Sequence, residues 1–289
     1  MKHQLIILFA TNETMCFVSF IKTTMTLHES VFLPVILFNS AVWTNLAATD
    51  IKKLQTIQLK YLKRIVRAPY STPNAFVFLE YGVLPIEYLI HIRQLTFLHH
   101  ITHLDQNDPV FVMFKQQQQL PYEKNWTNHI LNLLRQYNIQ FSEVETSSKD
   151  KWKLTVKSAV RTVAFHTLTE QIASKSKTQH LEYLDIALQP YLLHYTHKQA
   201  STIFKIRSRS TECKQNRKSA NDNMLCRLCE TSEETQTHVT NCPVLSPNGP
   251  ILDLNCIMGH IVPTDYDETM EICSRFNEFS KQINTCTYM

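Results

Sequence analysis

Glycine is scarce in this sequence, which holds only three glycines among 289 residues. Average usage would give about twenty in a chain of this length. Glycine-rich phosphate-binding loops and dinucleotide-binding motifs need several glycines close together, because their backbone must approach a phosphate closely. Both kinds of site are therefore excluded. Scarce glycine, combined with long stretches of Leu, Ile, Lys and Gln, predicts a mainly helical protein.

A membrane-spanning apolar run is also lacking. The run from Val31 to Trp43 contains Pro34 and Asn39 and is shorter than the roughly 20 apolar residues that a helix needs to cross a bilayer. We interpret this run as a buried core segment.

The first residues show only a weak targeting pattern. Lys2 precedes the apolar run Leu5 to Ala10, as in a signal peptide, but Asn12 and Glu13 then interrupt the pattern. No small-residue cleavage site follows clearly. We expect an intracellular protein of the nucleus or cytoplasm, with secretion as the alternative.

A strong charge excess is absent too, because the sequence has 29 Lys and Arg residues and 25 Asp and Glu residues. The net charge of +4 is too small by itself to indicate nucleic-acid binding. Eight cysteines are many for an intracellular chain, and disulfide frameworks belong mainly to small secreted domains. Their clustering indicates metal binding in a reducing compartment.

The clearest predicted helix runs from about Asp50 to Arg67. Thr49 or Asp50 offers an N-cap oxygen, and Pro69 prevents continuation. At about 100° per residue, its apolar side chains share one face: Ile51, Leu54, Ile57, Tyr61, Leu62, Ile65 and Val66. Its basic side chains share the other, with no acidic residue among them: Lys52, Lys53, Lys60, Lys63, Arg64 and Arg67. Like charges repel at helical spacing, so this face predicts contact with phosphate; an ordinary solvated face is the alternative.

A second helix is predicted from Pro85 to about His103. His99 and His103 are four residues apart, with His100 beside them. Two histidines at this spacing could hold a metal, but no carboxylate or cysteine nearby in the helix completes a site. We interpret them as packed or surface histidines.

The strongest local motif combines Cys226 and Cys229 with His238 and Cys242. A CxxC turn directs two thiolates at one centre, and residues four apart lie on one face of a helix. Thr231 and Glu234 fit a capping box before that helix. Three thiolates and one imidazole fill the four positions of a tetrahedral Zn²⁺, which predicts a structural rather than a catalytic zinc; cysteines scattered by chance are the alternative.

A basic stretch precedes this motif, opposed only by Glu212. A zinc element beside basic residues is typical of proteins that bind single strands or backbone phosphate. A soluble linker is the alternative. The basic residues are Lys205, Arg207, Arg209, Lys214, Arg217 and Lys218.

The order of several motifs resembles the C-terminal part of non-LTR (LINE-type) retrotransposon reverse transcriptases, over roughly residues 25–245. The stretches that carry the resemblance are Leu27 to Trp43, Thr49 to Arg67, Ser71 to Asn74, Gly82 to Glu87, Ser201 to Arg207, and the Cys226 to Cys242 motif with Glu234 to Gln236. The resemblance implies a thumb-like helical region, a linker and a CCHC zinc element that binds element RNA and target DNA.

The polymerase site of that family is missing. Its aromatic-x-Asp-Asp hairpin has no counterpart here, and Asp265 to Glu268 is expected to be a polar loop. The residues after Cys242 are too few for the nuclease domain that some relatives carry. The resemblance thus implies a remnant of a larger polymerase, with no catalytic residues of its own.

Together these observations predict a mainly α protein, an irregular helical bundle with a small C-terminal CCHC zinc element. The expected parts are an apolar segment (1–48), a thumb-like helical region (49–142), a helical linker with a polar start at Glu143 to Asp150 and the basic stretch (143–218), the zinc element (219–245) and a patternless tail (246–289). The expected function is nucleic-acid binding without catalysis, small-molecule substrate or membrane. The alternatives are a zinc-organised protein-interaction module and, with no recognisable nucleophile and base, a hydrolase.

Overall fold

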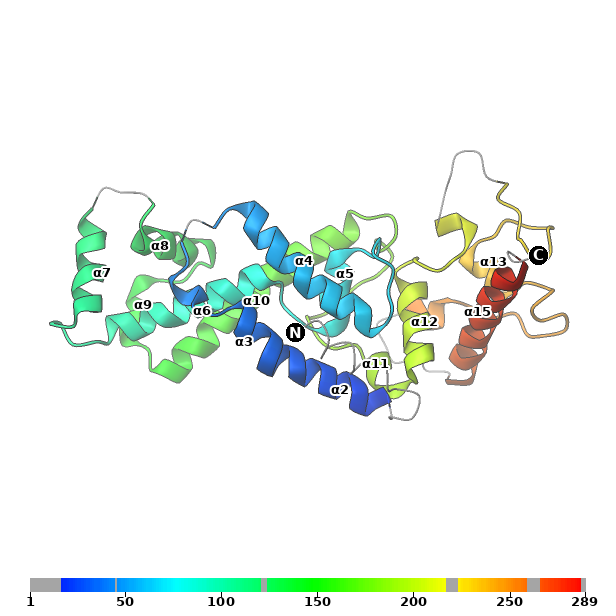
Figure 1. The fold of residues 1–289 in the computed structure, drawn as a ribbon, viewed down its shortest axis with the longest axis horizontal. Coiled ribbons are helices and arrows are strands. Elements are labelled where there is room, and N and C mark those ends of the chain that lie inside the picture. The colour runs from blue at the N-terminus through cyan, green and yellow to red at the C-terminus, as the bar shows by residue number, and fades with distance from the viewer. Residues whose placement is uncertain (1–16, 45, 121–123, 217–222, 259–265, 287–289) are drawn as a thin grey trace.

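The structure is a computed structural model that describes residues 17–44, 46–120, 124–216, 223–258 and 266–286. These residues form helices joined by turns, and no β-strand occurs among them. The predicted mainly α class is confirmed. In Figure 1 the helices form an elongated molecule, with α7, α8 and α9 at one end and α12, α13 and α15 at the other.

The elements follow one another in this order: α2 (Phe17–Leu27), a π-helical turn (His28–Phe32), α3 (Leu33–Ile36), a 3-10 turn (Ser40–Val42), α4 (Ala48–Ile65), α5 (Asn74–Tyr81), α6 (Ile86–Thr102), α7 (Pro109–Gln119), α8 (Trp126–Gln136), α9 (Phe141–Thr146), α10 (Lys149–Ala173), α11 (Tyr191–His194), α12 (His197–Arg207), a 3-10 turn (Lys214–Asn216), α13 (Gln236–Thr240), α14 (Asn255–Met258) and α15 (Tyr266–Cys286).

The long helix α10 joins two hydrophobic cores. Its buried side chains recur every four residues: Trp152, Val156, Val160, Ala164, Leu168 and Ile172. Four residues turn an α-helix by about 400°, so each step moves the buried position by about 40° around the axis. Over the whole helix the buried side rotates by about 200°, which lets α10 face one core with its first half and the other with its second half.

The first core lies among α6, α7, α8, α9 and the first half of α10. Trp152 is its largest fully buried side chain, and its indole Nε1 donates to the Leu95 carbonyl at 2.9 Å. Leu98, Phe114 and Ile130 bring α6, α7 and α8 into contact with it. Polar side chains buried beside this core, among them His91, Gln94 and His99, are hydrogen-bonded.

The second core runs from α4 and α5 through the second half of α10 to α12, α13 and α15. It contains Leu62 of α4, Phe76 of α5, Phe204 of α12 and Phe279 of α15. Cys226 and Cys242 of the predicted zinc element belong to it as well. The cysteine and histidine cluster is therefore part of the larger core rather than a separate unit.

Helix α4 differs from the sequence prediction at both ends. It begins at Ala48, after an N-cap Ala47 whose side chain cannot cap, so the predicted Thr49 or Asp50 cap is wrong. It ends at Ile65 in a Schellman turn: the Ala68 amide donates to the Lys63 carbonyl at 2.8 Å and Arg67 has a φ of +49°. The predicted apolar face is buried near this end, but Ile57 is 48% exposed.

The apolar run from Val31 to Trp43 is only partly buried, which corrects its interpretation as a core segment. Leu37 is buried against α6, whereas Phe38 is 70% exposed and Val31, Val35 and Val42 are more than half exposed. The π-helical stretch joins α2 to α3 without a break, and the chain then turns at Asn39, which has a φ of +55°, so only part of the run packs on α6.

No described helix is by itself long and apolar enough to cross a membrane. The pair α5 and α6 meets that criterion only when counted together across a bend of 59°. Most side chains of α5 are buried in the second core, and α6 contributes to the first core. Core packing accounts for their apolar composition.

The polar start of the predicted helical linker and the tail without a clear sequence pattern both contain helices. Glu143 to Asp150 covers part of α9 and the start of α10, and Ser147 between them accepts a hydrogen bond from His99. The tail contains α15, whose Ile272, Phe276 and Phe279 are buried in the second core. The acidic residues predicted as a polar loop occupy the first turn of α15 at Asp267 and Glu268, where the helix dipole favours negative charge; Asp265 lies outside the described residues.

Candidate metal centre and basic surface

The four predicted metal ligands converge. Cys226, Cys229, His238 and Cys242 each offer one ligand atom, and these atoms all lie within 4.8 Å of one another. Tetrahedral bonds of about 2.3 Å to sulfur place ligand atoms about 3.8 Å apart, so small side-chain adjustments suffice to coordinate one ion. The His238 Nε2 and the Cys229 Sγ are already 3.3 Å apart. The chain can therefore hold a metal ion here, as predicted.

A short hairpin positions the first two thiols. The Cys226 amide donates to the Ser232 carbonyl at 2.8 Å, and the Glu234 amide donates to the Met224 carbonyl at 2.8 Å. Between these bonds the chain turns through Glu230, which has a φ of +57°. The Leu228 amide lies 3.4 Å from the Cys226 sulfur, as expected of a CxxC turn whose amides stabilise a thiolate.

Helix α13 supplies the histidine, and its cap differs from the prediction. The N-cap is Thr235, whose hydroxyl accepts a hydrogen bond from the His238 amide at 3.0 Å. The predicted capping box is wrong, because the Thr231 hydroxyl instead donates to the Cys229 sulfur at 3.1 Å. Cys242 follows the short helix and still reaches the cluster.

Glu234 organises the base of the hairpin rather than capping a helix. Its fully buried carboxylate accepts from the Arg227 side chain at 2.7 Å, from the Arg227 amide at 2.9 Å and from the Lys214 amide at 2.9 Å. Burial alone would raise the pKa of this carboxyl, but the hydrogen bonds from Arg227 and Lys214 lower it below its usual value. The Arg227 guanidinium also lies over the Phe279 ring at 5.4 Å, which ties the hairpin to α15.

The thiols of the cluster differ in acidity. For Cys229 burial acts to raise the pKa, but hydrogen bonds, first from the Thr231 hydroxyl, outweigh it and bring the pKa to about 6. Burial raises the pKa of Cys242 to about 11, and the neighbouring Cys226 and Cys229 add to the rise. Crowded thiolates repel one another, so a bound cation would stabilise all three.

The described cysteines outside the cluster are also reduced. Cys213 and Cys273 are buried free thiols, so no disulfide occurs among the cysteines whose side chains the structure describes. Burial raises the pKa of Cys213 to about 12. These two cysteines pack as small apolar side chains.

Lys63 does not belong to the predicted basic face. It is 7% exposed, and its ammonium donates to the carbonyls of Tyr70 and Thr72 at 2.8 and 2.7 Å and to Asn74 Oδ1 at 3.1 Å. The Schellman turn after α4 brings this loop back over Lys63. Helical periodicity placed Lys63 among the surface cations, but the following loop covers it.

The other basic residues of α4 remain on the surface. Lys52, Lys60 and Arg64 are exposed, as is Arg67 just after the helix. Lys53 is exposed as well but pairs with Asp50 at 2.9 Å. Asp50 lies beside the predicted basic face, and this ion pair offsets the charge of Lys53 at the N-terminal end of the helix.

Arg207 is the second predicted nucleic-acid contact that the structure removes from the surface. It is 2% exposed, and its Nη2 lies 3.0 Å from Glu80 Oε1 in a buried ion pair. Its Nη1 donates to the Ile257 carbonyl at 2.8 Å. Arg207 thus links α5, α12 and α14.

Most of the basic stretch near Arg207 is engaged in the fold. Lys214 donates to the carbonyls of Asn223 and Leu225 at 2.8 and 2.7 Å, at the start of the hairpin. Arg209 donates to the Ser176 carbonyl at 3.2 Å. Lys205 is half-buried, and Arg217 and Lys218 lie outside the described residues.

The structure brings Lys205 close to Arg67, although they are far apart in sequence. Burial lowers the pKa of Lys205; Glu212 opposes this change, and the positive charge of Arg67 adds to it. Burial also lowers the pKa of His197, with smaller contributions from Arg67 and Lys205. The two basic segments of the sequence therefore meet where α4 ends beside α12.

The polar centre of the second core was not foreseen. The Glu80 carboxylate accepts hydrogen bonds from the hydroxyls of Tyr183 and Tyr191 as well as from Arg207. Burial raises the pKa of both tyrosines well above 10, and the Glu80 charge adds to the rise. A glutamate within the apolar stretch Phe76 to Tyr81 is the sequence signal that could have revealed it, because a buried carboxylate requires partners.

Comparison of this chain with known protein families, with characterised proteins and with solved structures gave no match.

Proposed function

We propose that this chain is a non-catalytic C-terminal segment of a LINE-type reverse transcriptase that binds nucleic acid. A structural Zn²⁺ would be held by Cys226, Cys229, His238 and Cys242. The motif order described above supports the family, and the converging ligands support the ion. Three thiolates and one imidazole form a soft donor set that suits Zn²⁺ and fills its coordination sphere. The ion would stabilise the hairpin and would leave no position for a substrate.

The observation that carries nucleic-acid binding is the row of exposed cations on α4. Lys52, Lys60 and Arg64 share one side of the helix, and Arg67 continues the row beyond its end to Lys205. Cations of this kind can neutralise backbone phosphates, which releases counterions and favours binding. Element RNA and target DNA are the proposed partners.

Salt dependence of binding tests this proposal. We expect the logarithm of the binding constant for single-stranded RNA to fall with the logarithm of salt concentration, with a slope of about −0.7 per phosphate contacted. The double substitution Lys60→Glu with Arg64→Glu should make the slope shallower by about 1.4. Lys157→Glu, at an exposed position of α10, is the matched control. A binding constant that does not change with salt concentration would contradict the proposal.

A second candidate is a zinc-organised protein-interaction module. The exposed apolar side chains Val31, Val35, Phe38 and Val42 favour it, because clustered exposed apolar groups mark interaction surfaces. In that case reversing Lys60 and Arg64 leaves partner binding intact, whereas Phe38→Asp abolishes it. The two variants therefore separate the candidates.

A further inference from the structure

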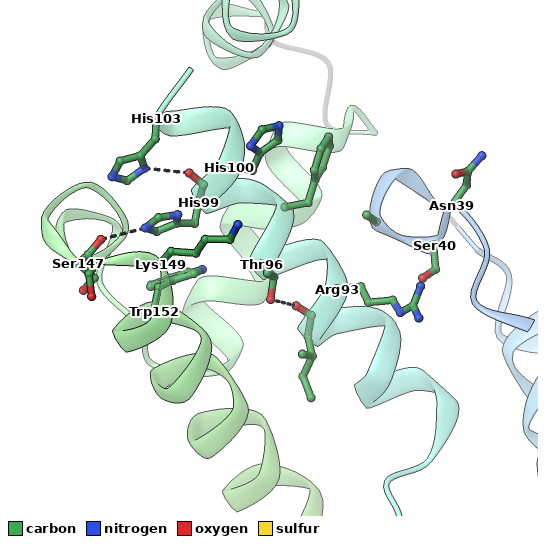
Figure 2. A pocket seen from close by; sticks show the side chains of 14 residues that line it. Asn39, Ser40, Arg93, Thr96, His99, His100, His103, Ser147, Lys149 and Trp152 are labelled. Atoms are coloured by element: carbon green, nitrogen blue, oxygen red, sulfur yellow. Dashed lines mark hydrogen bonds between the residues drawn. The ribbon is translucent and has the colours of Figure 1, made fainter. Parts of the chain in front are cut away.

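A cavity of about 750 Å³ lies far from the metal centre, over the exposed side of α6. Figure 2 shows α6 running between two walls: the loop with Asn39 and Ser40 on one side, and Ser147, Lys149 and Trp152 at the start of α10 on the other. The cavity is within the size range of sites that hold small organic ligands.

The charges of this cavity are all of one sign. Arg93 and Lys149 are its two permanent cations, and His99, His100 and His103 add three imidazoles. No lining residue carries a carboxylate. The nearest acidic neighbour in sequence, Asp150, is exposed and lies 3.8 Å from the ammonium of Lys153. The chemistry of the lining therefore selects an anion.

One hydroxyl beside the same space lacks a partner in the described part of the chain, and a helix N-terminus lies at its rim. The Ser40 hydroxyl lines the cavity, is 0% exposed and has no hydrogen-bond partner among the described residues. The 25-residue helix α10 begins at Lys149, after the N-cap Ser148, so its first amides and its dipole add positive potential at the rim. Figure 2 shows the Lys149 side chain extending from this point across α6.

Aromatic rings form the rest of the surface. The rings of His103 and His99 stack with centroids 4.0 Å apart, and His99 in turn stacks over Trp152 at 6.1 Å. Hydrogen bonds hold this stack: His99 Nε2 donates to the Ser147 carbonyl at 2.9 Å, and His103 Nδ1 donates to the His99 carbonyl at 2.8 Å. Across α6, His100 lies against Phe97 at 6.0 Å.

We propose that this cavity binds one nucleotide unit of a single-stranded nucleic acid. Lys149 and Arg93 would hold the phosphate, and the rings of His103, His100 and Phe97 would contact the base, since His99 is covered by His103 and Trp152. Single strands bind to proteins through this combination of cationic groups and aromatic faces. The inference rests on the proposed function for its ligand class, but it assigns a site separate from α4.

Calorimetric titration of the full chain tests the site with three probes: inorganic phosphate, adenosine 5′-monophosphate and a short oligothymidylate. We expect the nucleotide to bind more tightly than phosphate, because only the nucleotide contacts the rings, and the oligothymidylate to bind most tightly. Lys149→Ala should weaken nucleotide binding by roughly tenfold, the effect of losing one charge-assisted hydrogen bond. Lys151 is an exposed lysine of the same helix outside the cavity, so Lys151→Ala should leave the affinity for the nucleotide unchanged.

Three outcomes would overturn the proposal: no binding of any probe, phosphate binding as tightly as the nucleotide, or equal losses in the two lysine variants. The double variant Lys60→Glu with Arg64→Glu separates this site from the proposed function. If the cavity is correctly assigned, that variant binds the mononucleotide normally even when its affinity for long strands falls. If the α4 surface is wrongly assigned, the Lys60→Glu with Arg64→Glu variant binds long strands normally. The Lys149→Ala variant still binds the mononucleotide more weakly than the unmodified protein does.

A footprint on the unmodified protein needs no variant. Histidine acylation followed by peptide mass mapping should show that adenosine 5′-monophosphate protects His100 and His103. His166, whose side chain is 75% exposed on α10 and outside the cavity, is the internal control and should react equally with and without nucleotide. Unchanged reactivity of His100 and His103 at saturating nucleotide would contradict the assignment.

Discussion

The two cores that α10 joins contain different kinds of side chain. The first core surrounds Trp152 with apolar side chains, and the buried polar groups beside it, such as His91 and His99, form single hydrogen bonds. The second core contains the ion pair of Glu80 and Arg207, the buried carboxylate of Glu234 and the thiols of the metal cluster. Truncating a side chain in an apolar core destabilises the protein in proportion to the volume removed. In a core with buried charges, removing one partner leaves the other charge buried and unpaired, which costs more. The second core is therefore the one that single polar substitutions should break.

The largest expected effect is loss of the metal. Structural zinc supplies on the order of 10 kcal/mol of folding free energy in zinc-finger peptides. We expect about one metal ion per chain in reduced protein, and its loss when Cys229 or His238 is replaced by alanine. Hydrogen exchange should then rise in residues 224–242 and in α15, which packs against them, while the first core stays protected.

Cys273→Ser is the control for the metal experiment. Cys273 is buried in the same core but is not a member of the cluster, so this variant should keep its metal. Reduced protein that contains no metal, or exchange that rises equally in both cores, would contradict the comparison.

The next largest effect is expected at Arg207. Arg207→Met leaves the Glu80 carboxylate buried without its cation, which costs about 3–5 kcal/mol in other proteins. Urea unfolding followed by circular dichroism measures the loss. Adding Glu80→Gln should recover part of the stability, because the glutamine is uncharged, its oxygen still accepts a hydrogen bond from one of the two tyrosines, and its amide group can donate to the other. A double variant less stable than Arg207→Met would show that the ion pair is not the cause.

Acid should weaken the first core through His91. Burial, with a smaller contribution from His129, lowers the pKa of His91 from 6.5 to about 4. Because the folded pKa lies below the unfolded one, the neutral ring contributes its full stabilisation above pH 6.5. That stabilisation falls by about 3 kcal/mol as the pH drops from 6.5 to 4.

Tryptophan fluorescence during urea unfolding reports on this core, because Trp126 and Trp152 belong to it or pack against it. His91→Gln should show a smaller loss of stability between pH 7 and pH 4 than the unmodified protein. Burial lowers the pKa of His28, near the second core, to about 4 as well. An unchanged pH dependence in the His91 variant would assign the acid sensitivity to other groups.

The smallest effect concerns two lysines three residues apart on α4. Lys63→Met removes the three hydrogen bonds that hold residues 70–74 and should cost about 2 kcal/mol. Lys60→Met changes an exposed side chain and should cost less than about 0.5 kcal/mol. Thermal unfolding of the pair compares a buried cation with a surface one; equal losses would refute the buried role of Lys63.

Local patterns determined much of this protein. The CxxC spacing and the histidine four residues before Cys242 predicted a cluster that the fold brings together, because such spacings constrain ligand positions within a few residues. Scarce glycine and helical periodicity predicted the mainly α fold. The regular spacing of Ile272, Phe276, Phe279 and Ile283 could have predicted α15 in the same way.

Tertiary contacts decided what local patterns could not. Periodicity assigns a side chain to a side of its helix, but whether that side meets solvent depends on segments distant in sequence. The loop that follows α4 folds back over Lys63 and buries it. Arg207 is buried because it pairs with the carboxylate of Glu80, which lies 127 residues away in the sequence. The same reason explains α10, whose buried positions rotate around the helix because two separate cores lie along it. Burial is a property of the assembled fold, so the sequence alone identified the cations but not which of them remain on the surface.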